Sequence, residues 1–127
     1  MKQSQFKVRC FHHKAGATIS ELPTLPSDKD ACLRLALIRE ELEELAVGFA
    51  SHNLIEIADA IGDLLYVTLG TAVTCGIQIA PIFNAIHISN MSKFLDGYRS
   101  ANGKWIKGPS YKPVNLQPIL EHQLLDY

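Results

Sequence analysis

One stretch of the sequence, residues 37–70, constrains the fold more than any other part, because it sets carboxylates within two apolar segments. The first segment carries apolar side chains at intervals of three and four residues: Ile38, Leu42, Leu45 and Phe49. The second segment repeats that interval: Ile57, Ile61, Leu64 and Thr68. Such a period is typical of amphipathic helices. A short polar turn at residues 51–53 separates the segments, so the sequence predicts two antiparallel helices.

Carboxylates occupy matching positions on these two predicted helices. Glu41 and Glu44 are three residues apart and therefore share a face. Glu56 and Asp59 share a face in the same way, and Asp63 follows one turn later. A helix rises about 1.5 Å per residue, so Glu44 and Asp59 are expected at similar distances from the turn. We therefore expect the two acidic groups to face each other across the hairpin.

Carboxylates that converge in a partly apolar setting destabilise a protein unless a cation neutralises them. Oxygen ligands of this kind suit Mg²⁺, with Mn²⁺ as a possible substitute. The predicted metal ligands are Glu41, Glu44, Glu56, Asp59 and Asp63. Bound Mg²⁺ often completes its coordination with phosphate oxygens, which points to a phosphorylated substrate. Glu40, beside these ligands, is the predicted catalytic residue, which orients or deprotonates a water. The alternative is a solvated acidic face.

The rest of the chain favours an all-α protein. We predict a single domain over residues 1–127: a four-helix-bundle-like core and an extended or small-hairpin tail from about residue 95. The expected helices cover these ranges: 6–15, 28–50, 54–75, and a fourth that begins near Pro81. Asn102-Gly103 favours a hairpin turn, and Pro109, Pro113 and Pro118 predict extended chain around them.

Composition narrows the function classes. The net charge of −1 gives no basic surface for a nucleic-acid polymer. Residues 77–88 are apolar but too short, and interrupted by Pro81, to span a bilayer, so no membrane partner is expected. Cys10, Cys32 and Cys75 fit no zinc spacing and predict buried, reduced thiols in a cytoplasmic protein.

A second group of polar residues lies in the fourth helix and the tail. Asn90 falls on the same stripe as Phe83 and Ile86, so its amide is expected to face the interior and bind a base, a sugar or a carboxylate. Lys93, three residues later, can reach a phosphate as a point charge. In the tail, Lys107 and Tyr111 are further candidates for substrate binding. The alternative for the tail is a solvated basic segment that packs its aromatic residues on the bundle.

Taken in order, these motifs resemble a known family. Glu40-Glu41-x-x-Glu44 followed by Glu56-x-x-Asp59 is similar to the EExxE…ExxD pattern of the all-α nucleoside triphosphate pyrophosphohydrolases. This MazG-like group includes phosphoribosyl-ATP pyrophosphohydrolase. Residues 87–93 (His-Ile-Ser-Asn-Met-Ser-Lys) and 107–113 (Lys-Gly-Pro-Ser-Tyr-Lys-Pro) resemble that branch.

The resemblance implies Mg²⁺-dependent hydrolysis of a nucleoside or deoxynucleoside triphosphate to its monophosphate and pyrophosphate. It implies metal binding by Glu41, Glu44, Glu56 and Asp59, with the nucleotide near Asn90 and Lys93. Homodimers or homotetramers are also implied, and nucleotide-pool sanitising follows by analogy. One departure is Ile88, which stands where the pattern leads us to expect a basic residue.

Two further functions remain open at this point. One is a biosynthetic phosphoribosyl-ATP pyrophosphohydrolase, and the other is a non-catalytic helical module that binds a nucleotide or a partner. A ferritin-like di-iron protein is disfavoured because neither acidic group is followed by a histidine at the required spacing of three residues.

Overall fold

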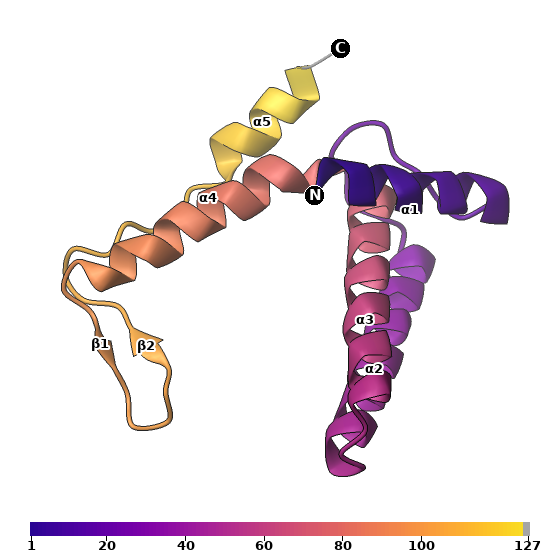
Figure 1. The fold of residues 1–127 in the computed structure, drawn as a ribbon. Coiled ribbons are helices and arrows are strands. Elements are labelled where there is room, and N and C mark those ends of the chain that lie inside the picture. The colour runs from indigo at the N-terminus through magenta and orange to yellow at the C-terminus, as the bar shows by residue number, and fades with distance from the viewer. Residues whose placement is uncertain (126–127) are drawn as a thin grey trace. The chain divides into compact units, whose positions relative to one another are not determined.

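The structure is a computed structural model that describes residues 1–125. Five α-helices and one two-stranded sheet make up the described chain, so the predicted all-α class with a small hairpin is confirmed (Figure 1). In chain order the elements are α1 (Lys2–Ala15), α2 (Asp28–Ala50), α3 (Leu54–Cys75), α4 (Ile79–Met91), the 3₁₀ helix η1 (Ser92–Phe94), β1 (Tyr98–Arg99), β2 (Trp105–Ile106) and α5 (Gln117–Leu125). The chain divides after Ile79 into two compact units, called unit 1 and unit 2 below.

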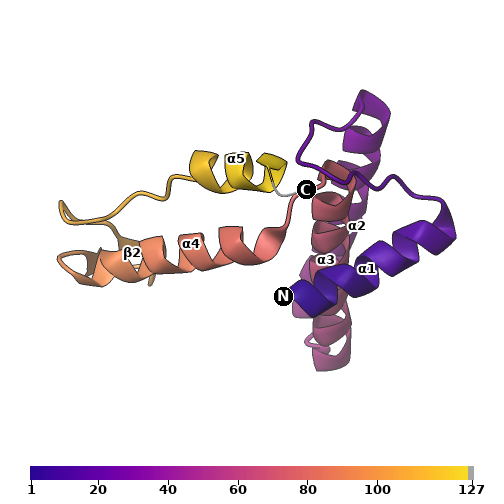
Figure 2. The ribbon, with the colours of Figure 1, turned by 90° about the horizontal axis from the view of Figure 1, so that it is seen from above.

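In unit 1, α2 and α3 form the predicted antiparallel hairpin (Figures 1 and 2). Local hydrogen bonds explain where both helices begin. The Ser27 hydroxyl accepts from the Asp30 N–H, and the Asn53 side chain accepts from the N–H groups of Ile55 and Glu56. Such caps satisfy N–H donors that have no partner within the helix. Gly76, in the left-handed conformation, ends α3.

Near the turn, a glycine lets the two helices approach closely. A Cβ atom at Gly48 would lie 3.0 Å from Ile57 Cγ1 and 3.1 Å from the Ile57 backbone nitrogen. Because the backbone of α3 occupies that space, a larger side chain at Gly48 would push the helices apart. The close approach fixes the register of the hairpin, and with it the heights of the carboxylates farther along.

Helix α1 packs against the C-terminal half of α3 and completes unit 1 (Figure 2). Val8, Leu69 and Val73 form a buried apolar core between them. Helix α1 begins four residues earlier than the predicted start. The side chain of Gln5 accounts for part of that extension, because it donates to the Ile77 carbonyl at 2.7 Å and accepts from the Ile79 N–H at 3.0 Å.

A buried arginine links α2 to α3. The Arg34 guanidinium donates to the Val67 carbonyl at 2.9 Å and to the Thr71 hydroxyl at 3.4 Å, and burial lowers the pKa of Arg34. A Cβ atom at Gly70 would overlap the Arg34 side chain and approach His12 Nε2 at 2.9 Å. Glycine at this position therefore leaves room for two buried polar side chains.

Unit 2 begins with α4 and contains the hairpin and α5. Tyr98 pairs with Ile106 and Arg99 with Trp105, which confirms the predicted hairpin. The turn residue Gly103 has a φ of 86°, a conformation that favours glycine. The chain then runs back along α4 to α5 (Figures 1 and 2).

The prediction of extended chain around Pro118 was wrong. Pro118 is the second residue of α5, where proline is tolerated because the N–H it lacks would have no helical partner. The Asn115 side chain accepts from the Gln117 N–H at 3.2 Å and caps the start of this helix. Proline therefore marks a helix start here, as Pro81 does in the first turn of α4.

The prediction of buried thiols was wrong for two of the three cysteines. Cys10 and Cys32 are exposed, Cys75 is half-buried, and all three are free. Cys10 lies next to exposed Phe11 on α1, and Cys32 next to exposed Leu33 on α2, so both thiols lie outside the packed faces of their helices. Burial raises the pKa of the Cys75 thiol.

Within residues 1–125, α3 is the one helix long and apolar enough to cross a membrane by length and composition. It also packs along α2 and α1 and carries Glu56, Asp59 and Asp63. Of its most apolar 18-residue window, 33% is buried within the structure.

Candidate functional site

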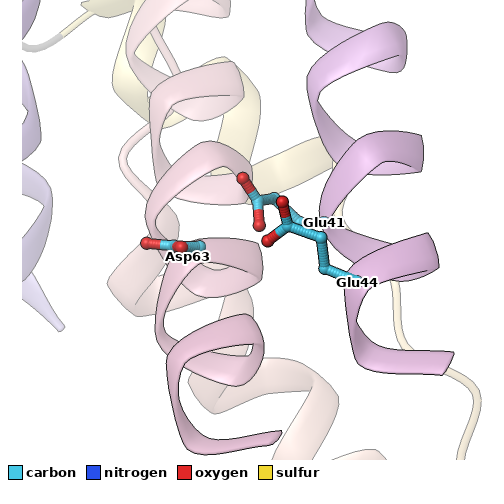
Figure 3. A group of neighbouring side chains, drawn as sticks. All are labelled: Glu41, Glu44 and Asp63. Carbon is cyan, nitrogen blue, oxygen red and sulfur yellow. The ribbon is translucent and has the colours of Figure 1, made fainter. Parts of the chain in front are cut away.

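Three carboxylates converge in the middle of the α2–α3 hairpin. Glu41 and Glu44 extend from α2 toward α3, which carries Asp63 (Figure 3). One oxygen atom from each of these residues lies within 4.8 Å of the others. Glu41 and Asp63 are half-buried, whereas Glu44 is exposed. The hairpin thus brings together acidic side chains from both predicted groups, as the matched heights indicated. We call these three residues the carboxylate cluster.

Glu41 is the most constrained member of the cluster. Its Oε2 atom is buried and has no hydrogen-bond partner in the part of the chain that the structure describes. Burial is the main reason that the pKa of Glu41 rises to about 7, and the neighbouring Glu44, Asp63 and Glu40 raise it further. Below pH 7 Glu41 is therefore mostly protonated in the metal-free cluster, and a bound cation would displace that proton.

A cavity of about 560 Å³ opens on the same hairpin and holds the other predicted ligands. Its lining residues are Glu40, Glu43, Glu44, Val47, Glu56 and Asp59. Glu56 and Asp59 thus lie outside the three-residue cluster and share the cavity with Glu44, a member of both groups. The structure divides the five predicted ligands between two adjoining groups, and their role in metal binding stays a prediction.

Two further glutamates line this cavity. Glu40, the predicted catalytic residue, is exposed and lies on its wall. Glu43 was not among the predicted site residues, although it follows Glu40 by three positions and so falls on the same face of α2. That spacing was the signal by which the sequence could have identified it.

Within residues 1–125, no lysine, arginine or histidine side chain forms an ion pair with a carboxylate of the α2–α3 hairpin. The one ion pair there joins Arg9 to Glu21, which lie on α1 and in the loop after it. The acidic residues of the hairpin therefore face one another without a protein cation. A buried carboxylate oxygen with no partner and a set of oxygen donors from two helices fit a divalent cation such as Mg²⁺.

The predicted substrate-binding residues all belong to unit 2. Lys93 is half-buried in η1, and Lys107 is exposed with its Nζ 5.1 Å from the centre of the Tyr111 ring. The Tyr111 hydroxyl hydrogen-bonds with the Ser89 hydroxyl at 3.0 Å. The roles of these residues in substrate binding stay predictions.

The expectation that Asn90 faces the interior was wrong. Asn90 is exposed, whereas the adjacent Ser89 and the later Ser92 are buried, 4% and 8% exposed. The returning tail packs on the side of α4 that carries Ser89, where the Ser89 hydroxyl donates to the Lys112 carbonyl at 2.7 Å. The pattern of apolar residues in α4 does not reveal this contact, because the serines bond to the backbone of Lys112 and not to an apolar side chain.

The chain matches a known family profile over residues 8–90, and that profile is described as phosphoribosyl-ATP pyrophosphohydrolase. The match covers more than half of the chain, including the whole α2–α3 hairpin with its carboxylates. The chain therefore belongs to the phosphoribosyl-ATP pyrophosphohydrolase family, within the MazG-like all-α superfamily. This is a family of hydrolases that act on phosphoanhydride bonds.

A viral protein shares part of this sequence. The chain is 38% identical over 71 residues to an uncharacterized protein of Acanthamoeba polyphaga mimivirus. The shared region is 56% of this chain and 28% of the viral protein, so this chain spans well under half of that relative.

Proposed function

We propose that this protein is a Mg²⁺-dependent nucleotide pyrophosphohydrolase that converts a nucleoside or deoxynucleoside triphosphate to its monophosphate and pyrophosphate. The observation that carries the proposal is the carboxylate cluster, with its unpartnered buried Glu41 oxygen, in the hairpin that the family profile covers. A divalent metal ion binds most favourably where oxygen donors converge and no positively charged side chain already neutralises them.

The hairpin residues divide the work of the proposed site. Glu41, Glu44 and Asp63 would hold a cation, and Glu56 and Asp59 would add donors from the adjoining cavity. When bound, Mg²⁺ would neutralise charge on the phosphates and lower the pKa of a coordinated water. Glu40, which is exposed in that cavity, would orient a water and accept its proton. The water oxygen adds to a phosphorus, the bond between the α- and β-phosphates breaks, and pyrophosphate leaves.

We further propose that the predicted substrate-binding residues of unit 2 contact the nucleotide: Asn90, Lys93, Lys107 and Tyr111. Lys93 and Lys107 supply positive charge for phosphate groups, and exposed Asn90 can donate and accept hydrogen bonds with a base or sugar. A role in removing unwanted nucleotides, in the cytoplasm, is part of the proposal by analogy with the resemblance described above.

A second candidate substrate is phosphoribosyl-ATP, because the matched family profile carries that name. Both reactions break a phosphoanhydride bond and release pyrophosphate, so the carboxylate cluster suits either. They differ in the group attached to the base, and that part of the substrate would be recognised away from the metal.

Pyrophosphate release from a panel of substrates tests the proposal. The panel contains ribo- and deoxyribonucleoside triphosphates and phosphoribosyl-ATP, each with Mg²⁺ and with EDTA. We expect turnover of one or a few triphosphates in the presence of Mg²⁺, and we expect EDTA to abolish that turnover. Turnover of phosphoribosyl-ATP alone would favour the biosynthetic alternative. Mg²⁺-dependent nucleotide binding without any turnover would replace the enzyme with a binding module.

Self-association belongs to the same proposal, as a homodimer or homotetramer. Helix α2 exposes Leu35, Leu42 and Phe49, which are each seven residues apart and therefore form one stripe. Their side chains are 49%, 55% and 60% exposed. An exposed apolar stripe of this length is the kind of surface that a second copy of a helical protein covers.

A further inference from the structure

The best-defined polar network of unit 2 joins α4 and η1 to the returning tail. Ser89 contacts the Tyr111 hydroxyl at 3.0 Å and donates to the Lys112 carbonyl at 2.7 Å. Ser92 donates to the Ser89 carbonyl at 2.6 Å and accepts from the Lys112 N–H at 2.8 Å. Two buried hydroxyls thus hold both backbone groups of Lys112. We call residues 107–112 the strap.

A second contact fixes the other half of the strap. The Ser110 N–H donates to both carboxylate oxygens of Asp96, at 3.1 and 3.0 Å. A Cβ atom at Gly108 would overlap the Asp96 carbonyl and carboxylate. The strap therefore lies directly on Asp96, and glycine at position 108 is a requirement of that approach.

These contacts determine where the positively charged side chain of the strap, Lys107, lies. The Lys107 ammonium is 5.1 Å from the centre of the Tyr111 ring, within the range of a cation–π contact. The hydroxyl end of that ring is held by Ser89, so the buried serine fixes the surface on which the ammonium rests. Lys107 is exposed and has no carboxylate partner within residues 1–125, so its charge is available to an anion.

We propose that Ser89 and Ser92 are positioning residues, which hold the strap so that Lys107 and Tyr111 form a preorganised binding site for a phosphate group of the substrate. The identity of that ligand rests on the proposed function. The segments 87–93 and 107–113, which are separate in the sequence, form one hydrogen-bonded structure in unit 2.

Preorganisation is the physical basis of the expected effect. A lysine on a mobile tail loses side-chain and backbone freedom when it binds an anion, and that loss weakens binding. A strap already fixed by buried hydrogen bonds avoids most of this loss. Removing one serine hydroxyl should therefore weaken anion binding, although Lys107 and the Tyr111 ring are themselves unchanged.

The test uses the full chain with two measurements. Calorimetry gives the Kd of inorganic pyrophosphate, and steady-state kinetics give KM and kcat for the best triphosphate. We expect Ser89→Ala and Ser92→Ala each to raise Kd and KM about five- to tenfold, as loss of one buried hydrogen bond predicts, with kcat changed less than about twofold. Ser100→Ala, which removes a serine hydroxyl in the hairpin turn of the same unit, is the control and should change neither.

A double-mutant cycle separates positioning from a general loss of structure. In a Lys107→Met background, Ser92→Ala should raise Kd and KM less than about twofold, because the cation that it positions is gone. An equal effect in both backgrounds would overturn the proposal. Unchanged Kd and KM in Ser89→Ala and Ser92→Ala would also overturn it.

A milder variant covers the case in which an alanine variant fails to fold. Tyr111→Phe keeps the ring under Lys107 and removes only the hydroxyl that meets Ser89, and it should raise Kd and KM about two- to fivefold. The two proposals fail in distinguishable ways. A wild-type protein without turnover that still binds pyrophosphate through Lys107 contradicts the reaction only, whereas turnover with strap variants indistinguishable from wild type contradicts the strap only.

Discussion

At the scale of single residues, Glu41 is the residue on which the proposed metal site depends most. Its carboxylate shares one small space with Glu44 and Asp63, and one of its oxygens has no partner in residues 1–125. A carboxylate in this position is unfavourable without a neutralising charge, and the proposed divalent cation would supply that charge. Glu41 therefore fits a role in ligand binding better than a role in stabilising the metal-free fold.

The pKa of Glu41 leads to a prediction about stability and pH. Its pKa is raised from 4.5 to about 7 by burial and neighbouring carboxylates, so between these values the folded state binds more protons than the unfolded state. Stability contributed by this group is therefore present below pH 4.5 and is lost as pH rises through 7. Metal-free protein should have a higher urea midpoint at pH 5.5 than at pH 7.5.

The variant Glu41→Gln isolates this contribution. The glutamine does not titrate, so the difference in urea midpoint between pH 5.5 and pH 7.5 should shrink relative to wild type, with EDTA present in both cases. The same pH dependence in both proteins would show that Glu41 has an ordinary pKa in the folded state.

Asn90 and Ser89 give a second test at this scale. Asn90 is exposed, so Asn90→Ala should change the free energy of unfolding by less than about 0.5 kcal/mol. Ser89 is buried and bonded to the strap, so Ser89→Ala should destabilise the protein by about 1–3 kcal/mol. Chemical denaturation of the two variants measures both values. The reverse order would mean that Asn90 faces the interior, as the apolar stripe suggested.

At the scale of elements, the sequence predicted those helix ends correctly that depend on residues within the same helical turn. The bounds of α2 and α3 were predicted correctly because Ser27, Asn53 and Gly76 act within their own turns. The start of α5 was missed because Pro118 fits both an extended segment and a first helical turn.

The candidate site follows the same division. Helical spacing alone predicted that the two acidic groups would face each other across the hairpin, and Glu41, Glu44 and Asp63 do converge in the structure. The separation of Glu56 and Asp59 into an adjoining cavity depends on side-chain directions that spacing does not give. The buried side of α4 depends on where the strap returns, about twenty residues later in the chain.

The cap of α3 is an element whose loss should be measurable. Asn53→Ala removes the acceptor for the N–H groups of Ile55 and Glu56, so we expect a loss of about 0.5–2 kcal/mol in the free energy of unfolding. Asn84→Ala, at an exposed position within α4, is the matched control and should cost less. Equal losses from the two substitutions would argue against a special role for the cap.

At the scale of the whole molecule, exposed apolar side chains of α2 support the proposed self-association. Unit 1 has a small buried core around Val8, Leu69 and Val73, while α2 exposes the stripe of Leu35, Leu42 and Phe49. The proposed second copy would cover this stripe and add buried apolar area that unit 1 does not supply by itself.

The stripe predicts the effect of one charge on the oligomeric state. Leu42→Glu places a carboxylate at the centre of the stripe, so sedimentation velocity should show a shift from a homodimer or homotetramer toward monomer. Lys14→Glu, a charge change at the exposed end of α1, is the control and should leave the mass unchanged. A monomeric wild-type protein would contradict the assembly while leaving the site within α2 and α3 intact.

The proposed function places Mg²⁺-dependent pyrophosphate release at the α2–α3 hairpin. The most direct measurement compares wild type, Glu41→Gln and Glu121→Gln at saturating Mg²⁺ with the best triphosphate of the panel. Glu121 is an exposed carboxylate on α5, which serves as the matched control. We predict that Glu41→Gln reduces kcat/KM by at least about 100-fold, while Glu121→Gln retains wild-type activity. Full activity of Glu41→Gln would contradict the proposed metal site at the carboxylate cluster.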